Sequence, residues 1–296
     1  MPSPASSVDQ RKKLLGILLR VGVFALIAAL GYYLVFPLII AFLGAPVLVI
    51  STLGTFAAAA VANTLALRIY ERGRLSDIGL GWTPASRRNL WLGILGGFGA
   101  ALVVILTPLV LRVADFERVP NEHLRWPSLL FVSILLLFGA VGEEMLFRGY
   151  GFQVLVRGIG PFATILPVAV LFGLAHSQNL NFGPLALLNT ILWGVVLGYA
   201  YLRSGDLWLP IGLHFGWNWA LPMLGANLSG FTMDVTGYAM HWKIGGPLSG
   251  GAYGPEGGLL TTAVAIGLFF YVGKAPIQPQ GPTEEVCFVG ISRLTF

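Results

Sequence analysis

Long apolar runs occupy most of this sequence, and they constrain its fold more than any other feature. The runs are long enough to span the hydrocarbon core of a bilayer, which takes about 20 helical residues. An open sheet edge in lipid would leave backbone groups without hydrogen-bond partners, so each run is predicted to be helical. The predicted spans cover residues 14–36, 38–67, 90–111, 128–157, 161–177, 185–203, 207–225 and 258–274. We therefore predict an all-α, polytopic transmembrane helix bundle of about eight spanning helices.

Composition and charge agree with a membrane location. The chain is 56% hydrophobic and only 10% charged, whereas about a quarter of the residues in a soluble domain are charged. With a cytoplasmic N-terminus, most arginines and lysines fall in cytoplasmic segments, which explains the net charge of +5 without a nucleic-acid partner. We predict a multi-pass protein of the plasma (bacterial inner) membrane, with both termini in the cytoplasm and the lipid bilayer as a partner.

The chain is predicted to form one domain with a short tail. Residues 1–274 hold all the predicted spans, and residues 275–296, which contain three prolines, are predicted to be a mobile C-terminal tail. The Gly-rich segment 227–258 is predicted to be an external loop. Cys287 is the only cysteine, so neither an intramolecular disulfide nor a cysteine-based metal site can form.

The stretch "GEEMLFRGY" at residues 142–150 places charges in an apolar run. An ionised residue in mid-span costs about 2.5 to 3.5 kcal/mol, so it needs a partner, a water-filled cavity or a function. Glu144 and Arg148 are four residues apart, in the favourable order for an ion pair on one helical face. Glu143 points about 100° away from that face, so a group on another element must balance its charge. A purely structural packing network of these three residues is the alternative.

Two later motifs carry further polar residues. "FGLAH" ends in His176, and "HFGWN" places His214 and Asn218 one turn apart on one helical face. A single histidine in an apolar helix is usually a packing residue, but these three residues and Glu143 come from three separate spans. Counted from the predicted helix ends, Glu143 and His176 lie at a similar depth of about 20 Å. We expect the four side chains to meet around one cavity that opens to the cytoplasm.

The motifs "EEMLFR", "FGLAH" and "HFGWN" resemble those of the CPBP family, the CAAX protease and bacteriocin-processing proteins, also called the type II CAAX prenyl endopeptidase or ABI family. The likeness covers about residues 128–225. The loop "LSGGAYGPEGG" is also similar to loops of bacterial members. The resemblance implies a transmembrane protease domain with its catalytic core in that region. It implies a CAAX-type intramembrane endopeptidase, a hydrolase, but not its substrate, since the family includes both prenyl-protein processing and bacteriocin maturation.

Peptide hydrolysis needs a base that activates water and donors that hold the oxyanion. We expect Glu143 and His176 to activate the water, and His214 and Asn218 to donate to the oxyanion. Glu144 and Arg148 would orient Glu143.

The cofactor stays open at this point. Zinc is an alternative, with Glu143, His176 and His214 as its ligands, because family members have been described both as metalloproteases and as metal-free glutamate proteases. The expected substrate is a membrane-tethered, hydrophobic or lipidated protein or peptide.

Two other functions also bury charges in membrane spans. A proton-coupled transporter would use a Glu–His relay, but it would also show spans related by internal repeats, and the sequence shows none. A non-catalytic scaffold or immunity protein would keep the polar core for packing alone. In that case, replacing Glu143 would change abundance rather than turnover.

Overall fold

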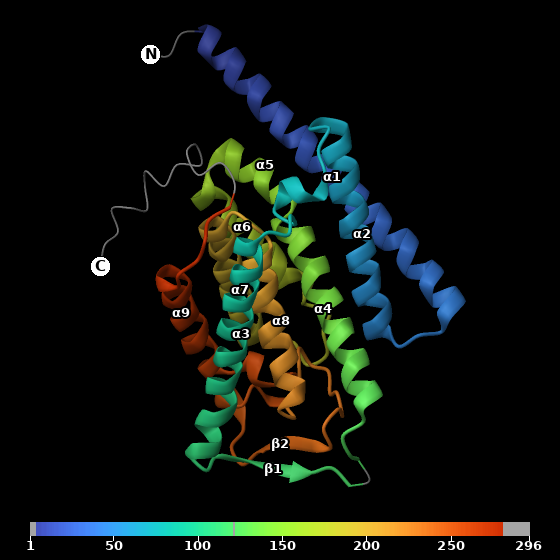
Figure 1. The fold of residues 1–296 in the computed structure, drawn as a ribbon, viewed down its shortest axis with the longest axis vertical. Helices are drawn as coiled ribbons and strands as arrows, with labels where there is room; N and C mark the ends of the chain where they lie inside the picture. The colour runs from blue at the N-terminus through green and yellow to red at the C-terminus, as the bar shows by residue number, and fades with distance from the viewer. Residues whose placement is uncertain (1–3, 121, 281–296) are drawn as a thin grey trace.

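The computed structural model describes residues 4–120 and 122–280, and the chain forms a helix bundle (Figure 1). Within these residues nine α-helices are present. They are α1 (Pro4–Leu43), α2 (Val47–Tyr70), α3 (Pro84–Val110), α4 (Trp126–Arg148), α5 (Tyr150–Ile159), α6 (Pro161–Ala175), α7 (Pro184–Ser204), α8 (Trp208–Met223) and α9 (Leu259–Lys274). The predicted all-α bundle is confirmed.

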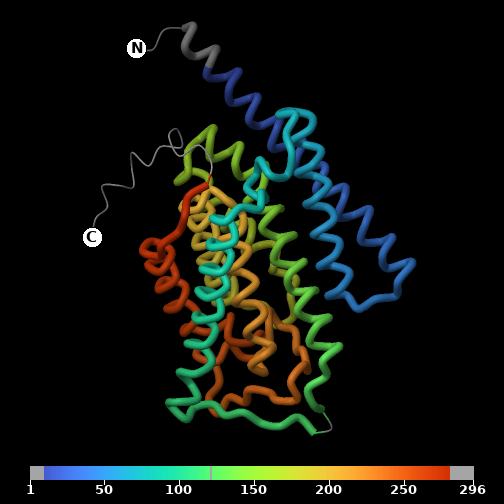
Figure 2. The backbone as a smooth tube through the Cα atoms, viewed as in Figure 1, coloured from blue at the N-terminus to red at the C-terminus, as the bar shows by residue number. Residues whose placement is uncertain are grey.

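Five helical segments are long and apolar enough to cross a membrane, so the chain is an integral, multi-pass membrane protein. They are Gln10–Leu43, Val47–Tyr70, Pro84–Val110, Pro184–Ser204 and Trp126–Ile159, which takes α4 and α5 together. The helices α6 and α9 are apolar but have only 15 and 16 residues. Helix α1 begins and α9 ends at the same end of the bundle (Figures 1 and 2).

The boundary predicted between the first two spans was wrong. Helix α1 continues through Pro37 to Leu43, and the chain turns at Gly44, whose φ of 53° lies in the left-handed region that favours glycine. Pro46 then precedes α2. The loop therefore forms at Gly44, where glycine permits the chain to reverse. The predicted boundary was at Pro37, seven residues earlier.

The fourth predicted span is two helices, because α4 ends at Arg148 and α5 begins at Tyr150. Asn63 of α2 lies at this break. Its amide donates to the carbonyl of Met145 at 2.9 Å, and its oxygen accepts from the N–H of Tyr150 at 2.8 Å. Gly149 packs so closely that an added methyl would overlap Asn63. The estimated depth of Glu143 assumed one continuous helix to residue 157, and the break at Gly149 removes that assumption. Glu143 lies five residues, or about 7.5 Å, before the end of α4.

Helices α3 and α8 pack backbone to backbone through glycines. Gly93 and Gly97 of α3 face Gly212 and Gly216 of α8, and a methyl on Gly97 would overlap the carbonyl oxygen of Leu213. Such small-residue contacts let helices approach closely without a hydrophobic driving force in lipid. Gly93 and Gly97, four residues apart on α3, therefore mark a close helix contact.

A small antiparallel sheet lies at the end of the bundle opposite to the start of α1 (Figure 1). Strand β1 (Ala114–Arg118) follows α3, and β2 (Tyr238–Trp242) belongs to the segment between α8 and α9. Ala114 pairs with Trp242 and Arg118 with Tyr238. The sheet was not predicted. Its strands lie outside the apolar runs, so the argument against strands in lipid did not apply to them.

The first residues after α9 pack against the bundle. The side chain of Asn89 in α3 bonds both the backbone C=O and the backbone N–H of Gln278, at 2.8 and 3.0 Å. The amide of Gln280 donates to Asp206 at 2.8 Å. The remainder of the predicted tail, residues 281–296 with Cys287, lies outside the described residues.

Candidate active site

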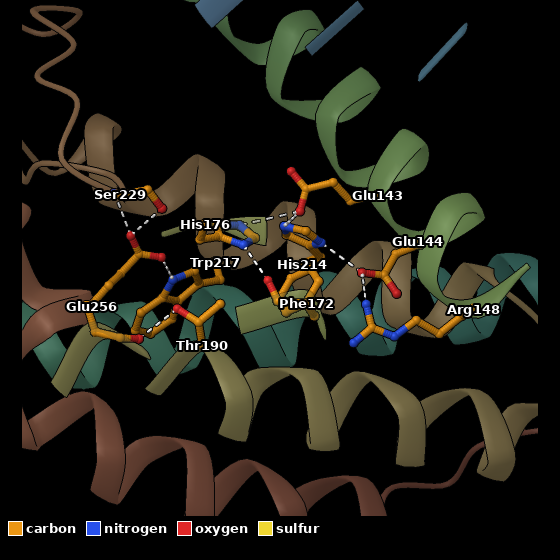
Figure 3. A network of polar contacts seen from close by, with 11 residues as sticks. Glu143, Glu144, Arg148, Phe172, His176, Thr190, His214, Trp217, Ser229 and Glu256 are labelled. Carbon is orange, nitrogen blue, oxygen red and sulfur yellow. Dashed lines mark hydrogen bonds and ion pairs between the residues drawn. The ribbon is translucent and has the colours of Figure 1, made fainter. Parts of the chain in front are cut away.

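Three helices bring Glu143, His176 and His214 together (Figure 3). Oε2 of Glu143, on α4, lies 3.7 Å from Nε2 of His176 at the end of α6 and 3.9 Å from Nε2 of His214 on α8. This oxygen is buried and has no hydrogen-bond partner among residues 4–120 and 122–280. The unpaired glutamate of the sequence therefore faces both histidines expected near it.

Each imidazole is oriented by its other nitrogen. Helix α6 ends at Ala175, and Nδ1 of His176 lies 2.8 Å from the Phe172 carbonyl in its last turn. Nδ1 of His214 lies 2.8 Å from Oε1 of Glu144. A carbonyl and a carboxylate accept, so each Nδ1 carries the donated proton. When a ring is neutral, its Nε2 turns a lone pair toward Glu143, and when it is protonated, Nε2 turns an N–H toward Glu143. With both rings neutral, three acceptor atoms converge on one point, which then requires a proton donor or a cation.

Glu144 is the centre of a buried ion network. Nη1 of Arg148 lies 3.2 Å from Oε1 of Glu144, and both side chains are fully buried. Arg148 also donates to the Gly194 carbonyl of α7 at 2.9 Å, and its guanidinium lies 4.7 Å from the ring centre of Phe172. The pair expected from the spacing is present. Its bond to His214 was missed, because helical spacing reveals only partners on the same helix.

The position of His214 depends on the contact between α3 and α8. Gly212 and Gly216 flank His214 in the sequence, and both meet the backbone of α3. His214 itself bonds Glu144 of α4 and lies edge-on to Phe172 of α6, with ring centres 6.1 Å apart. One face of α8 is therefore held by glycines while the other presents the imidazole to the site.

A small pocket with a cavity volume of about 40 Å³ lies beside this centre and is partly open to solvent. Its lining residues are Phe172, His176, Asn189, Thr190, Trp193, Leu197, His214, Trp217, Asn218, Ser229 and Glu256. Asn218 lines it together with His214, as their shared helical face predicted. Ser229 and Glu256 come from the segment predicted to be external, so the pocket extends away from the end where α1 begins. The lining does not support the expected opening toward the cytoplasm.

Glu256 is the residue of this pocket that sequence reasoning missed. Its Oε1 accepts from Nε1 of Trp217 at 2.9 Å, and its Oε2 accepts from Oγ of Ser229 at 2.8 Å (Figure 3). The available signal was a single acidic residue inside the Gly-rich "GPEGG". Such a residue is ordinary in a solvated loop, and only the folding of this loop against α8 places it in the pocket.

Two groups of side chains contain the carboxylates and imidazoles that bind metal ions. Among the described residues, the group with three ligand atoms all within 4.8 Å is Asp115, Glu117 and His241 on the sheet. It is solvent-exposed, and Nζ of Lys243 already pairs with Asp115 at 2.9 Å. The hydrogen bond from Lys243 lowers the pKa of Asp115. A cation at this group would have to compete with that lysine.

The predicted zinc ligands meet the chemical requirement but not the spacing. Glu143, His176 and His214 offer converging lone pairs, but Oε2 of Glu143 lies 3.7 and 3.9 Å from the two Nε2 atoms. Ligand atoms of one tetrahedral zinc lie about 3.3 Å apart, given bonds of about 2.0 Å. The spacing fits a shared water better than a directly bound zinc.

The fold and site define an all-α membrane protein with a glutamate–histidine centre inside the bundle. Residues 125–220 match the family model described as type II CAAX prenyl endopeptidase Rce1-like, and this region contains all three motifs. The resemblance seen in the three motifs is confirmed over these residues, which are similar to this CAAX protease family.

A relative gives a second similarity. Over 148 residues the chain is 30% identical to an uncharacterised 24.3 kDa protein of Escherichia coli, a match that covers 48% of this chain and 62% of that protein. The match thus spans less than two thirds of that relative. No solved structure matches the chain.

Proposed function

We propose that this protein is an intramembrane endopeptidase that hydrolyses a peptide bond in a membrane-associated protein or peptide. The observation that carries the proposal is the position of Oε2 of Glu143, which is buried, has no hydrogen-bond partner and lies 3.7 and 3.9 Å from Nε2 of two histidines. A water at this point donates to acceptors that otherwise lack donors. The Rce1-like match over residues 125–220 supports the same reaction class.

In the proposed reaction, Glu143 is the general base. It takes a proton from a water held between its Oε2 and Nε2 of His176, and the hydroxide attacks the carbonyl carbon of the scissile bond. The tetrahedral intermediate then collapses, and Glu143 returns the proton to the leaving amine. Water supplies the atoms added to the two products, so no other reactant is needed.

His214 and Asn218 are the proposed donors to the oxyanion. Nδ1 of His214 already donates to Glu144, so Nε2 donates only when the ring is protonated. The carboxylate of Glu144 stabilises that imidazolium. Asn218 lines the same pocket one turn further along α8, and its amide adds a neutral donor.

Zinc is the alternative to a metal-free reaction. Bound by Glu143, His176 and His214, it would supply an acidified water and polarise the carbonyl. The distances of 3.7 and 3.9 Å from Oε2 of Glu143 to the two imidazoles favour the metal-free arrangement.

The proposed substrate is tethered to the membrane, because large apolar side chains on the outer faces of the helices make the protein a partner of the lipid bilayer. Hydrophobic or lipidated chains suit such a site. The proposed location is the plasma membrane, with both termini on the cytoplasmic side, which agrees with α1 beginning and α9 ending at one end of the bundle (Figure 1).

The test compares purified wild type with Glu143→Gln and His176→Ala on a membrane-tethered reporter. Glu143→Gln keeps the shape but removes the base, so turnover should fall by about 10²-fold or more with an unchanged melting temperature. Glu117→Gln, which neutralises a carboxylate on the distant sheet, serves as the control and should cleave like wild type.

Loss of wild-type cleavage with a chelator, and its return with zinc, would favour the metal alternative. Normal cleavage by Glu143→Gln would rule out the proposed base. If Glu143→Gln changed the abundance of the protein but not its turnover, the scaffold function would be favoured. Proton flux without peptide cleavage would favour the transporter.

A further inference from the structure

Glu256 is a carboxylate in the pocket that has no positively charged partner in the structure. Its hydrogen bonds come from Nε1 of Trp217 and from the hydroxyl and backbone N–H of Ser229, which are all neutral donors. Within the described part of the chain, no ion pair includes it. Glu144, by contrast, has Arg148 and His214. The charge of Glu256 is therefore left for a ligand to balance.

The wall next to Glu256 carries a second group without a partner. Trp193 is only 7% exposed. Its Nε1 is a buried donor that has no acceptor in the described part of the chain. Its ring packs against Trp217, with ring centres 4.9 Å apart. Indole faces attract cations, and a free indole N–H suits a peptide carbonyl. The pocket thus offers a carboxylate beside aromatic surface, and the unpaired N–H of Trp193 is buried in its wall.

Glu256 lies close to the proposed reaction centre. It is bonded to Trp217, which follows His214 by three residues on α8, a rise of about 4.5 Å. An extended peptide advances about 3.3 to 3.6 Å per residue. If the scissile bond of a peptide lies at His214, the side chains that reach Glu256 are therefore those within about three residues of that bond.

We propose that Glu256 determines substrate specificity by binding a lysine or arginine side chain within about three residues of the scissile bond. The same charge repels an acidic side chain or a free C-terminal carboxylate at that distance. This inference rests on the proposed endopeptidase function. The expected substrate is cleaved close to a basic residue. The cleaved bond lies within a longer polypeptide and not near a free C-terminal carboxylate.

The experiment measures kcat/KM on membrane-tethered reporters that differ in one residue. Lysine, glutamine or glutamate is placed in turn at each of the three positions on either side of the cut. At one position or more, wild type should prefer lysine over glutamine by about tenfold and cleave the glutamate reporter most slowly. Glu256→Gln should lower this lysine-to-glutamine ratio to near one. Glu256→Asp, which keeps the charge, should retain a preference for lysine.

Glu117→Gln is the matched control, because it removes a carboxylate from the sheet and leaves the pocket intact. It should keep the wild-type ratio. If Glu256 serves only to hold its loop against α8, Glu256→Gln will slow all reporters by the same factor and leave the ratio unchanged, which overturns the inference. A wild type that cleaves all reporters equally overturns it too, while the endopeptidase function stands. A wild type that cleaves none overturns both.

Discussion

His214 and Glu144 form a direct hydrogen bond between α8 and α4, with Nδ1 of the imidazole 2.8 Å from Oε1 of the carboxylate. The same oxygen lies 3.2 Å from Nη1 of Arg148. Glu144 therefore serves two functions at once, since it neutralises a buried guanidinium and selects which nitrogen of His214 carries a proton. Glu143, one residue earlier, makes no such bonds and faces the opposite nitrogen of the ring.

This arrangement predicts different effects for the two glutamates. Glu144→Gln leaves Arg148 buried without a counter-ion, which should lower the free energy of unfolding by about 3 to 5 kcal/mol. It should also weaken the donation expected from His214. Thermal unfolding in detergent would show the loss, and Glu143→Gln, which breaks no ion pair with Arg148, is the control. A Glu144→Gln protein as stable as wild type would contradict the structural part of this assignment.

The glycine contact between α3 and α8 can be tested within one helix. Gly97→Ala places a methyl against the backbone of α8, whereas Gly99, two residues further along, has nothing within 4 Å of the same methyl. Gly97→Ala should cost about 1 to 3 kcal/mol of stability through overpacking and reduce turnover by displacing His214. Gly99→Ala should change stability by no more than about 1 kcal/mol. Equal effects of the two substitutions would show that the close approach does not position α8.

Much of the fold was predictable because membrane spans have a strong sequence signal. Apolar runs locate the helices, and a spacing of four residues locates the pair of Glu144 and Arg148. Contacts between helices have no such local signal. Asn63, which caps the break at Gly149, is 82 residues from Met145, whose carbonyl it binds. The apolar run at residues 128–157 was therefore predicted to be one continuous span.

The site was predictable only in part for the same reason. Motif positions nominated Glu143, His176 and His214, and the structure brings them together. The direction of the pocket depended on helix ends, whose positions the sequence places with an error of a turn or more. Glu256 lies 42 residues beyond His214 in a loop without periodicity, so its place beside Trp217 follows from tertiary folding alone.

The break between α4 and α5 leads to a prediction about Asn63. Asn63→Ala leaves the Met145 carbonyl and the Tyr150 N–H buried without their partner, which should cost about 1 to 3 kcal/mol. Because Glu143 and Arg148 lie near this end of α4, turnover should fall as well. Asn227→Ala is the control for unfolding measurements, because Asn227 is half-buried between α8 and α9 and its side-chain hydrogen bonds are exposed to solvent. Unchanged stability in Asn63→Ala would mean that Gly149 alone determines the break.

Membrane orientation is testable by cysteine labelling of intact cells. Single cysteines at Ser76 and Glu117, in a Cys287→Ser background, are both solvent-exposed and lie on opposite sides in the predicted topology. A membrane-impermeant reagent should label position 117 in intact cells, and position 76 only after lysis. The reverse pattern would place the pocket segment with Glu256 on the cytoplasmic side.

Asp206, in the turn between α7 and α8, should give stability a measurable pH dependence. It is 1% exposed, and burial raises the pKa of its carboxyl, although Asn89, Gln280 and the Leu209 N–H donate to it. A raised pKa in the folded state means that folding favours the protonated form. The contribution of this group is thus fully present below the ordinary value of 3.8 and is lost as pH rises through the raised folded pKa.

Asp206→Asn has no charge to titrate, so wild type should gain stability relative to this variant as pH falls from about 7 toward about 4. Melting temperatures of both proteins across that range would measure the difference. Asp234→Asn, a change at an exposed position near β2, is the control for the general effect of losing a carboxylate. A difference that shrinks as pH falls would show that the donors around Asp206 outweigh its burial, because they stabilise the ionised carboxylate.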